Sequence, residues 1–459
     1  MPGYFGTDGF RGRAGITLTA AHAFHIGQFL AHHLKQSSVG NTAPLRIRAV
    51  LGKDTRRSSY MLEYAMAAGL TAAGADAYML HVTTTPSISY VAAAENFDVG
   101  IMISASHNPY EDNGIKLVNG RGEKMEDQML ALIETYLDSI AEGNAPPIPQ
   151  AIGEDIGRIV DYTAGRNRYI GYLISLSTYS YRDLHVALDC ANGSAWMIGR
   201  NVFEALGAQV HTIGAEPNGL NINRGVGSTH MEHLAEYVRE HHFDIGFAFD
   251  GDADRCIAVD ERGEVVNGDH ILYILACDMA RRNMLTGITV VTTVMSNLGL
   301  YRALDRAGID YVQTTVGDRY VYEKMRSSGY ALGGEQSGHI IISKYATTGD
   351  GILTAILLME AMLSAKQPLS RLAAPVQMLP QRTRNLPIRD KDAIMNAPSV
   401  QEKLTELAEK LEGNGRILLR KSGTEPVIRI MVEAETDAKC SIYIEEMAAV
   451  IQKKEAEMP

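Results

Sequence analysis

Short β-rich runs alternate with longer helical patterns along most of this 459-residue chain. An alternation of this kind predicts an α/β fold, with parallel sheets covered by helices and functional residues in the loops at strand ends. In the first part of the chain we expect strands at 47–51, 77–81 and 99–104, and a helix that begins at Ser58 and ends at Gly74. This arrangement is a βαβ unit.

Elements of the same kinds recur along the rest of the chain. A second and a third stretch repeat the alternation of strand and helix, whereas the C-terminal stretch is shorter and mixes two strands with two helices. The expected elements are strands at 185–189, 209–213, 244–249, 417–419 and 427–433, an apolar run at 288–294, a helix over 391–411 and a final helix.

Two proline-rich stretches divide the chain. Residues 143–150 hold three prolines within four positions, and residues 367–387 hold four more. Proline removes backbone donors and favours extended linkers, so both stretches are expected domain boundaries. The prediction is three similar α/β domains, at 1–150, 151–255 and 256–367, followed by a smaller α+β domain at 368–459.

The charge balance limits the partners of the chain. It has 43 basic and 54 acidic residues, a net charge of −11, and 46% hydrophobic residues. This composition is typical of a globular protein and argues against nucleic acid or an anionic membrane as partner. The four cysteines are far apart and suit no disulfide framework or zinc site, and no signal peptide or membrane span is recognisable, so a cytoplasmic location is expected. Any anionic ligand would need a local cluster of cations.

The first of four chemically informative loops is ISASHNPYEDNGIK, residues 103–116. It leaves a β-rich run, so the hydroxyl of Ser106 is expected at a strand end, where it can meet a ligand. Adjacent side chains usually point apart, and we therefore expect no simple dyad of Ser106 with His107. A surface loop whose Asn, Pro and Gly serve only the turns is the alternative.

The second loop, DGDADR at 250–255, carries carboxylates at every second position between two apolar runs. Such a set of hard oxygen ligands suits Mg²⁺ or Ca²⁺. With Glu261, the spacing also fits an EF-hand, but position 6 of that loop requires glycine and is Arg255 here, and the flanks are predicted strands. A plain acidic turn is the other alternative.

The third loop is GGEQSGHI, residues 333–340, in which Glu335, Ser337 and His339 alternate. On an extended segment these side chains would share one face and could bind a polyhydroxylated ligand. A Gly-rich hairpin without such a role fits the sequence equally well.

The fourth loop is RKSGTEPVIR, residues 420–429, a predicted turn between two strands. Backbone N–H groups and hydroxyls of Ser422, Gly423 and Thr424, with the guanidinium groups of Arg420 and Arg429, would form an anion site. An exposed hairpin with incidental charge is the alternative. Taken together, the four loops indicate an enzyme that moves a phosphoryl group on a sugar phosphate.

At these residues the chain resembles the α-D-phosphohexomutases. The matches run from GTDGFRG at Gly6 to RKSGTEPVIRIMVE ending at Glu433, nearly the whole chain, and include TTVGDRYVYEKM and GGEQSGH. Within the family, these motifs are most similar to those of the bacterial branch that acts on glucosamine phosphate. The resemblance implies four domains around a central cleft, the last of them mobile.

The resemblance also implies roles for individual residues. Ser106 would carry the transferable phosphate, Arg11 and Lys116 would lie near the reacting phosphate, and either Lys116 or His339 would be the general acid/base. Mg²⁺ ligands would be Asp250, Asp252, Asp254 and an oxygen on Ser106. The implied substrate contacts are His107, Arg255, Asp318, Arg319, Glu335, Ser337, Arg420, Ser422, Gly423, Thr424 and Arg429. The basic residues among these are expected to make the site positively charged.

Two positions depart from the family pattern. Ala253 replaces a glycine that is common in the metal loop, and Lys421 stands where proline is common in the phosphate loop. Neither change removes a ligand.

The expected reaction is the reversible conversion of glucosamine 6-phosphate to glucosamine 1-phosphate, through phosphorylated Ser106 and a sugar 1,6-bisphosphate. It would feed the synthesis of UDP-N-acetylglucosamine and cell-wall precursors. The alternatives are a glucose or mannose phosphate substrate, a metal-dependent sugar-phosphate phosphatase, and a binder without activity. A homodimer is an expectation of the family.

Overall fold

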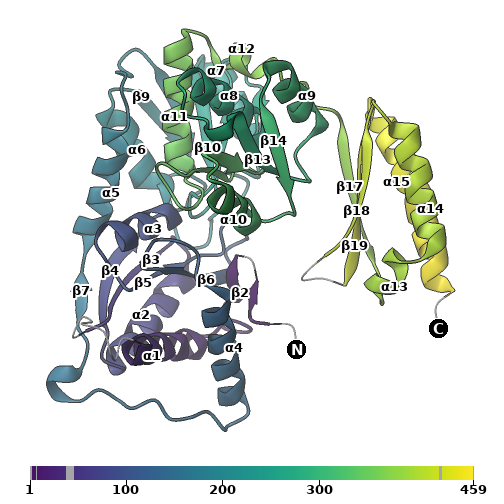
Figure 1. Ribbon diagram of the computed structural model, residues 1–459. Coiled ribbons are helices and arrows are strands. Elements are labelled where there is room, and N and C mark those ends of the chain that lie inside the picture. The colour runs from purple at the N-terminus through teal and green to yellow at the C-terminus, as the bar shows by residue number, and fades with distance from the viewer. Residues whose placement is uncertain (1–2, 7, 38–45, 423–425, 458–459) are drawn as a thin grey trace. The chain divides into compact units, whose positions relative to one another are not determined.

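The computed structural model describes residues 3–6, 8–37, 46–422 and 426–457 (Figure 1). By their internal contacts these residues form two compact units, which are described separately. The larger unit consists of Gly3–Val294 and Asp310–Ala373, and the smaller one of Met295–Ile309 and Ala374–Pro459. Among the described helices, none is both long and apolar enough to cross a membrane.

The larger unit begins with a seven-stranded sheet of order β1-β2-β6-β5-β3-β4-β7. The central strands β5, β3, β4 and β7 run parallel, whereas β1, β2 and β6 pair antiparallel at one side. The strands are β1 (Phe5–Gly6), β2 (Gly9–Arg13), β3 (Arg48–Lys53), β4 (Asp76–Val82), β5 (Val99–Ile103), β6 (Asp112–Asn119) and β7 (Ile159–Asp161). The helices before β7 are α1 (Ala20–Ser37), α2 (Arg57–Ala72), α3 (Thr85–Ala94), α4 (Asp127–Ala141) and the 3-10 turn η1 (Gly153–Asp155).

Both faces of this sheet are buried, which explains the nearly continuous apolar runs of its strands. On β3, Ala49 and Leu51 join the core under α1, α2 and α4, while Val50 between them joins the core under α3. Figure 1 shows α1, α2 and α4 on one side of the sheet and α3 on the other.

The second sheet has the order β12-β11-β10-β8-β9. Strands β8, β9 and β10 are parallel, and β11 and β12 add antiparallel to β10. The strands are β8 (His185–Asp189), β9 (Gln209–Ile213), β10 (Ile245–Phe249), β11 (Cys256–Val259) and β12 (Val265–Val266). Its helices are α5 (Thr163–Ser175), α6 (Ala195–Ala205), α7 (Glu232–His241) and α8 (Gly268–Arg281).

The third sheet has the order β14-β13-β15-β16, parallel except for the hairpin of β15 with β16. The strands are β13 (Thr289–Thr293), β14 (Asp310–Thr314), β15 (Leu332–Gly334) and β16 (Ile340–Ile342). Along the same stretch of the chain lie η2 (Thr286–Ile288), α10 (Asp318–Ser328), α11 (Gly351–Ala365) and α12 (Leu369–Ala373), and also α9 (Leu298–Ala307), which belongs to the smaller unit.

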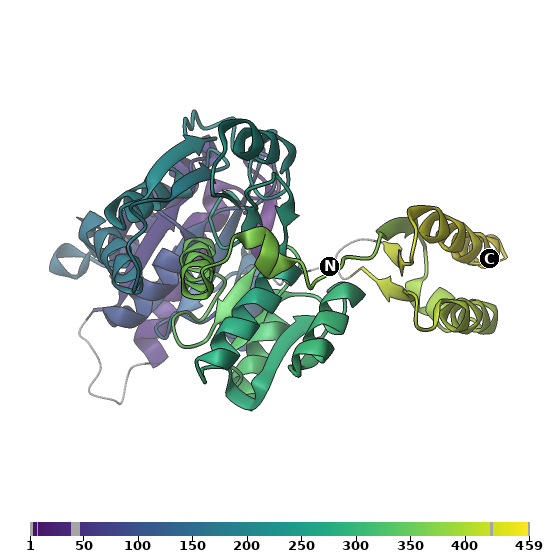
Figure 2. The ribbon, with the colours of Figure 1, turned by 90° about the horizontal axis from the view of Figure 1, so that it is seen from above.

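The smaller unit is built on a three-stranded antiparallel sheet of order β17-β19-β18. The strands are β17 (Gln381–Pro387), β18 (Arg416–Lys421) and β19 (Val427–Glu433), and the helices are α13 (Lys391–Met395), α14 (Pro398–Leu411) and α15 (Asp437–Ala456). Figure 2 shows α14 and α15 beside each other, and both contribute to one apolar core with the sheet.

Segment 295–309, which contains α9, belongs to this smaller unit by its contacts. The buried carboxylate of Glu433 accepts a hydrogen bond from the N–H of Leu298 (3.0 Å) and pairs with Arg416 (2.9 Å). The sequence pattern did not predict this attachment.

Several predicted elements agree with the structure and some differ. The strands at 185–189, 209–213 and 427–433 have the predicted bounds. Helix α2 begins at Arg57, so Ser58 is not its cap; its hydroxyl instead accepts a hydrogen bond from the Asn113 amide (2.9 Å). The single helix predicted over 391–411 is two helices, because Pro398 cannot continue a preceding helix and instead starts α14.

The sheets also extend past the predicted domain boundaries. Strand β7 follows residue 150 but pairs with β4 of the first sheet, and β11 and β12 follow residue 255 but belong to the second sheet. Pairing of strands far apart in the sequence is not visible in composition.

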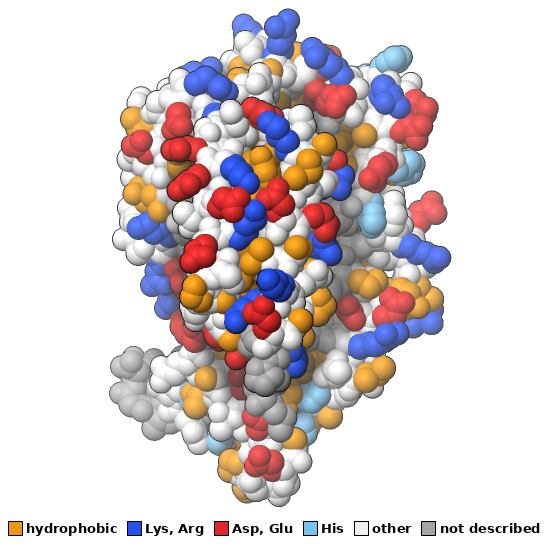
Figure 3. Space-filling model, turned by 90° about the vertical axis from the view of Figure 1, so that its right-hand side faces the viewer, with side chains coloured by type: hydrophobic (Ala, Val, Ile, Leu, Met, Phe, Trp, Pro, Cys, Tyr) orange, Lys and Arg blue, Asp and Glu red, His pale blue; other side chains and the backbone are white. Residues whose placement is uncertain are grey.

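Charge is mixed over the surface. The face shown in Figure 3 has acidic and basic side chains interspersed, and on α14 and α15 Lys403 and Lys410 pair with Glu406 and Glu446. The net charge of −11 is therefore not gathered on this face.

The separate cores of the two units predict separate responses to mutation. Ile430 is fully buried in β19, so we expect Ile430→Ala to lower the free energy of unfolding of the smaller unit by about 2–5 kcal/mol. Hydrogen exchange of β18 and β19 measures this loss. The only tryptophan of the chain, Trp196, lies in the larger unit, so the urea midpoint of its fluorescence should stay unchanged.

Ile442 of α15 is the matched control. It is 55% exposed, and Ile442→Ala should change stability by no more than about 0.5 kcal/mol. An equal shift of the tryptophan transition in Ile430→Ala would contradict the independence of the two cores.

Candidate active site

Ser106 lies in the turn that follows β5 and is almost fully buried. Its backbone is left-handed, with φ of +54°, a conformation that L-residues seldom adopt. The Ser106 hydroxyl donates to Asp250 Oδ2 (2.5 Å) and lies 3.2 Å from Nδ1 of His107. The expectation that Ser106 and His107 point apart is therefore wrong, because the left-handed turn brings the two side chains together.

His107 is not set up as a strong base. Burial, with a smaller effect from the guanidinium groups of Arg255 and Arg11, lowers the pKa of His107 to about 4. The imidazole is therefore neutral near pH 7 and can accept a hydrogen bond from the Ser106 hydroxyl.

The carboxylates of Asp250, Asp252 and Asp254 follow β10 and form one buried cluster. Their ligand oxygens lie within 4.8 Å of one another. Glycine is required at position 251, because a Cβ there would lie 2.5 Å from the carbonyl oxygen of Ser106. Ala253 has φ of +56°, which explains why glycine is common at this position in the family.

Because they are buried, these carboxylates interact strongly with one another and with the nearby Lys116 ammonium. Desolvation and the neighbouring carboxylates of Asp254 and Asp252 raise the pKa of Asp250 well above its usual range. The Lys116 ammonium lies 2.5 Å from Asp252 and 2.9 Å from Asp254. Although burial lowers the pKa of Lys116, these two carboxylates outweigh it and raise the pKa, so Lys116 is held as a cation.

The cluster has the oxygen donors that a hard divalent cation needs. Within the described part of the chain, Asp252 Oδ1 and Asp254 Oδ1 are buried and have no hydrogen-bond partner. Buried carboxylate oxygens without partners are expensive, and a bound cation would satisfy them. The flanking elements are strands β10 and β11, not the helices of an EF-hand. The residues present therefore fit Mg²⁺.

Arg11 and Lys116 reach the site from neighbouring strands. Arg11 of β2 stands opposite Gly114 of β6, so Arg11 and Lys116 lie on the same face of the sheet. Arg11 pairs with Asp8 at 3.3 Å. Burial raises the pKa of Asp8, but the charges of Lys124 and Arg11 outweigh it and lower the pKa.

His339 joins the cluster from the third sheet. Its Nε2 lies 3.3 Å from Asp318 and accepts a hydrogen bond from the N–H of Gly349 (3.0 Å), and its Nδ1 lies 3.7 Å from Asp254. Asp318, at the first turn of α10, also pairs with Lys124 at 2.6 Å.

The segment that carries Glu335 and His339 is a hairpin turn, not the extended segment first considered. Gly334 pairs with Ile340, and the residues between them form the turn of β15 with β16. Glu335 accepts a hydrogen bond from the N–H of Gly317 (3.1 Å), whereas Ser337 is exposed. The backbone therefore has the hairpin geometry of the alternative, while the binding role of Glu335 and Ser337 stays a prediction.

Not every predicted cation faces the cluster. Arg319 pairs with Asp127 and, at 2.8 Å, with Glu323. Arg255 lies 3.9 Å from Asp254. Since Arg11, Lys116, Arg255 and Arg319 all lie beside carboxylates, the site is not the simply basic one that was expected.

The predicted phosphate loop lies in the smaller unit. Arg420 of β18 is directly opposite Arg429 of β19, and Ser422 ends the hairpin with its N–H donating to Val427 (3.0 Å). Lys421 contacts the carboxylate of Asp392, so its added charge is paired. Gly423 and Thr424 lie outside the described residues.

Four site residues escaped the sequence reasoning. Asp8, within the GTDGFRG motif, and Lys124 interact with the predicted residues as described above. The Thr85 hydroxyl donates to Asp252, and Asn223 donates to the carbonyl oxygen of Ser106 (2.8 Å). Only Asp8 carried a signal, since it lies in a quoted motif; the others are recognisable only by the tertiary structure.

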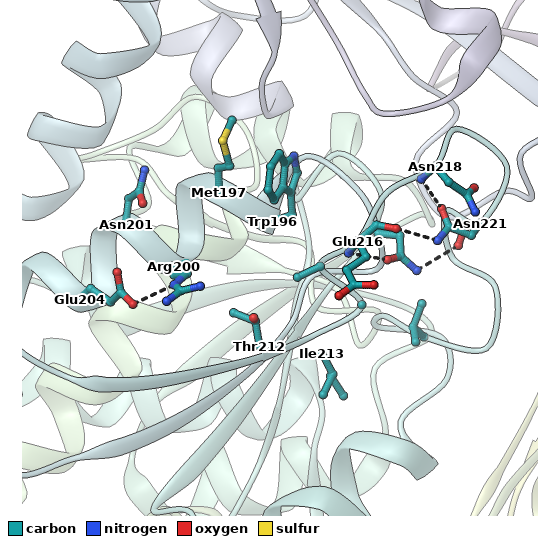
Figure 4. Close-up of a pocket in the computed structure, with 14 residues that line it drawn as sticks. Trp196, Met197, Arg200, Asn201, Glu204, Thr212, Ile213, Glu216, Asn218 and Asn221 are labelled. Atoms are coloured by element: carbon teal, nitrogen blue, oxygen red, sulfur yellow. Dashed lines mark hydrogen bonds and ion pairs between the residues drawn. The ribbon is translucent and has the colours of Figure 1, made fainter.

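Two cavities differ in their relation to this site. A small one, of about 50 Å³, is lined by Asp8, Lys116, Asp254 and Asp318 among others. A larger hollow, of about 960 Å³, lies between α6 and the end of β9, with Trp196, Arg200 and Glu216 in its wall (Figure 4). Of the predicted site residues that the structure describes, none lines the larger hollow.

Comparison with known proteins gives matches to four domain profiles in sequence order. Each is described as phosphoglucomutase/phosphomannomutase: alpha/beta/alpha domain I at 2–144, domain II at 167–263, domain III at 267–379, and the C-terminal domain at 384–450.

Curated relatives match the full length. A phosphoglucosamine mutase of Lachnospira eligens is 57% identical and one of Bacillus subtilis 45% identical, each over 454 residues and 99% of both chains. Among solved structures, a phosphoglucomutase/phosphomannomutase family protein from Burkholderia thailandensis is 25% identical, with a TM-score of 0.79 over 98% of this chain and 97% of its own.

A more distant structure agrees in fold. The N-acetylphosphoglucosamine mutase of Aspergillus fumigatus, solved with GlcNAc-6P and magnesium, is 19% identical, with a TM-score of 0.65 over 98% of this chain and 96% of its own. With the serine turn and the carboxylate cluster in the expected loops, these matches establish that the chain belongs to the phosphoglucomutase/phosphomannomutase family, the α-D-phosphohexomutases.

Proposed function

We propose that this protein is a phosphoglucosamine mutase, which interconverts glucosamine 6-phosphate and glucosamine 1-phosphate through phosphorylated Ser106. The observation that carries the proposal is the contact of the Ser106 hydroxyl with Asp250 inside a buried carboxylate cluster. The full-length relatives with 45–57% identity support the choice of an amino-sugar phosphate.

In the proposed reaction, phosphorylated Ser106 gives its phosphoryl group to the free hydroxyl of the bound sugar phosphate. The sugar 1,6-bisphosphate then turns over and returns its other phosphoryl group to Ser106. Transfer of this kind requires chiefly positioning and charge stabilisation from the protein.

The charged side chains have distinct parts in this proposal. Asp250, Asp252 and Asp254, with an oxygen on Ser106, would hold Mg²⁺, which would supply positive charge beside the transferring phosphoryl group. Lys116, held as a cation, orients that group together with Arg11. Lys116 retains its proton and is unsuited to act as a base, which leaves His339 as the other candidate for general acid/base. Burial lowers the pKa of His339, but Asp318 and Asp254 outweigh this effect and raise it.

We also propose which side chains bind the substrate. Glu335 and Ser337 would bind sugar hydroxyls near Arg255, His107, Asp318 and Arg319. The hairpin of the smaller unit, with Arg420, Ser422, Gly423, Thr424 and Arg429, would bind the phosphate that is not being transferred. A cytoplasmic homodimer is the expectation that follows from the resemblance.

A sugar-phosphate phosphatase would use the same serine and metal but pass the phosphoryl group to water. The Arg420–Arg429 pair favours the mutase, since a second phosphate site serves a bisphosphate intermediate and has no part in hydrolysis. Inorganic phosphate released in proportion to substrate consumed would identify the phosphatase.

Replacement of the serine tests the covalent step. Ser106→Ala should lower mutase turnover by roughly 10³-fold or more, because no group remains to carry the phosphate. Intact mass should show one phosphoryl group on the wild type after incubation with the bisphosphate, and none on the variant. Ser175→Ala, on the exposed part of α5, is the control, and substantial turnover by Ser106→Ala would contradict the role.

Metal binding can be tested without activity. Asp252→Asn should weaken Mg²⁺ binding by about tenfold or more in calorimetric titration, because it removes a charged ligand. Mg²⁺ should also raise the Tm of the wild type but not that of the variant. Asp260→Asn changes a buried carboxylate outside the cluster and should bind Mg²⁺ like the wild type; equal loss in both variants would argue against the site.

Substrate choice is tested by direct comparison. With a sugar 1,6-bisphosphate present as activator, kcat/KM for glucosamine 6-phosphate should exceed the values for glucose 6-phosphate and mannose 6-phosphate by about tenfold or more. A preference for either of the latter would keep the mutase mechanism and replace the proposed substrate.

A further inference from the structure

We propose that Arg56 is a positioning residue, which acts with Asp54 and Asn223 to hold the Ser106 turn in its left-handed conformation. The proposal rests on the proposed function, because it assigns these residues an effect on phosphoryl transfer from Ser106. Arg56 lies in the loop between β3 and α2.

Arg56 is fully buried, and its guanidinium group spans the carbonyl oxygens of the serine loop. Nη2 donates to the carbonyl oxygens of Ser106 (3.0 Å) and Asn108 (2.8 Å), and Nη1 lies 3.3 Å from those of Asn108 and Pro109. The planar group thus binds three backbone carbonyl oxygens of one loop at once, which an ammonium group cannot reproduce.

Asp54 connects the contact at the Ser106 carbonyl oxygen to the N–H of the same residue. It accepts a hydrogen bond from Arg56 Nε (3.0 Å) and one from the Ser104 hydroxyl (2.7 Å). The Ser104 hydroxyl in turn accepts the N–H of Ser106 (3.0 Å). Both the N–H and the carbonyl of Ser106 are therefore fixed by one charged pair, which allows a non-glycine residue to remain left-handed.

Asn223 also binds the backbone of the Ser106 turn, from the loop that follows β9 of the second sheet. Its amide donates to the carbonyl oxygens of Ser106 (2.8 Å) and Asn108 (2.9 Å), so two donors occupy the Ser106 carbonyl. The loop that carries Asn223 is itself braced, since the Asn221 amide donates to the Glu216 carbonyl (3.0 Å) and Asn221 accepts the N–H of Asn218 (2.9 Å), as drawn in Figure 4.

These contacts position the Ser106 backbone without touching its hydroxyl. In the described structure, the hydrogen bonds of Arg56 go to Asp54 and to backbone carbonyls, and none goes to the Asp250–Asp254 cluster. Loss of Arg56 should therefore move the phosphorylated oxygen while the three carboxylate ligands and the sugar contacts stay in place. A displacement of about 1 Å in a transfer reaction lowers the rate by about 100-fold.

The test compares Arg56→Lys and Asn223→Ala with the wild type at saturating Mg²⁺ and bisphosphate. We expect kcat to fall about 100-fold in Arg56→Lys and about tenfold in Asn223→Ala, with KM changed less than about twofold. Mg²⁺ affinity by calorimetry should fall less in both variants than in Asp252→Asn, because the three carboxylate ligands stay in place. In Arg56→Ala, added ethylguanidine should restore part of kcat.

Lys53→Met is the matched control. Lys53 and Glu63 form an equally buried ion pair, on the strand and the helix that flank the Arg56 loop. Among the described residues, the hydrogen bond and ion pair of the Lys53 side chain go to Glu63, not to the turn that carries Ser106. The Lys53→Met variant should lose stability and keep kcat. A loss of kcat in Lys53→Met as large as in Arg56→Lys would assign the effect to stability and overturn the proposal.

Two further outcomes separate this proposal from the proposed function. If the wild type itself shows no mutase turnover, the proposed function fails. If the wild type turns over while Asn223→Ala and a folded Arg56→Lys keep their kcat, or lose it only through KM, the positioning role is wrong and the function stands. Should Arg56→Lys fail to fold, Asn223→Ala, whose side chain lies at the edge of the network, decides the question.

Discussion

The burial of three carboxylates in one cluster is the constraint on which the larger unit depends. Removing like charges from water is unfavourable unless hydrogen bonds and opposite charges compensate for it. The compensation comes from distant parts of the chain: the Lys116 ammonium and the Thr85 and Ser106 hydroxyls all reach the Asp250–Asp254 turn from the first sheet and its loops. Formation of the cluster therefore requires the first and second sheets to meet, and a divalent cation would complete the same balance.

Backbone strain occurs at Ser106 and Ala253, where the loops of the first and second sheets contact each other. Ser106 and Ala253 both adopt left-handed φ values in the two turns that face each other. Such conformations persist only where the surroundings determine them fully. Around Ser106 this is achieved by the contacts of Arg56 and Asn223, which lie in the loops that follow β3 of the first sheet and β9 of the second. The Ser106 hydroxyl is thus positioned by contacts of the Ser106 backbone that do not involve the hydroxyl oxygen.

The positions of the charged side chains change the interpretation of the net charge of −11. An acidic chain that binds phosphate needs local cations, and these do lie in the motif loops. In the structure, however, Arg11, Lys116 and Arg255 each lie beside a carboxylate. In the proposed function, affinity for a phosphate would therefore depend on how these carboxylates are neutralised, and a divalent cation at the cluster would link the two.

Periodicity and loop composition alone were enough to predict the α/β class, six of the seven parallel strands of the first two sheets, and the loops that carry Ser106, Asp250–Asp254 and His339. These are local properties, because strand alternation and clusters of turn residues are written in consecutive positions. The hairpin at Glu335, the attachment of 295–309 to the smaller unit and the roles of Arg56, Asn223 and Lys124 were decided only by the tertiary structure. Each depends on contacts between residues far apart in the chain. The role of a buried arginine or asparagine depends on which residues it contacts, and only the folded structure brings those residues together.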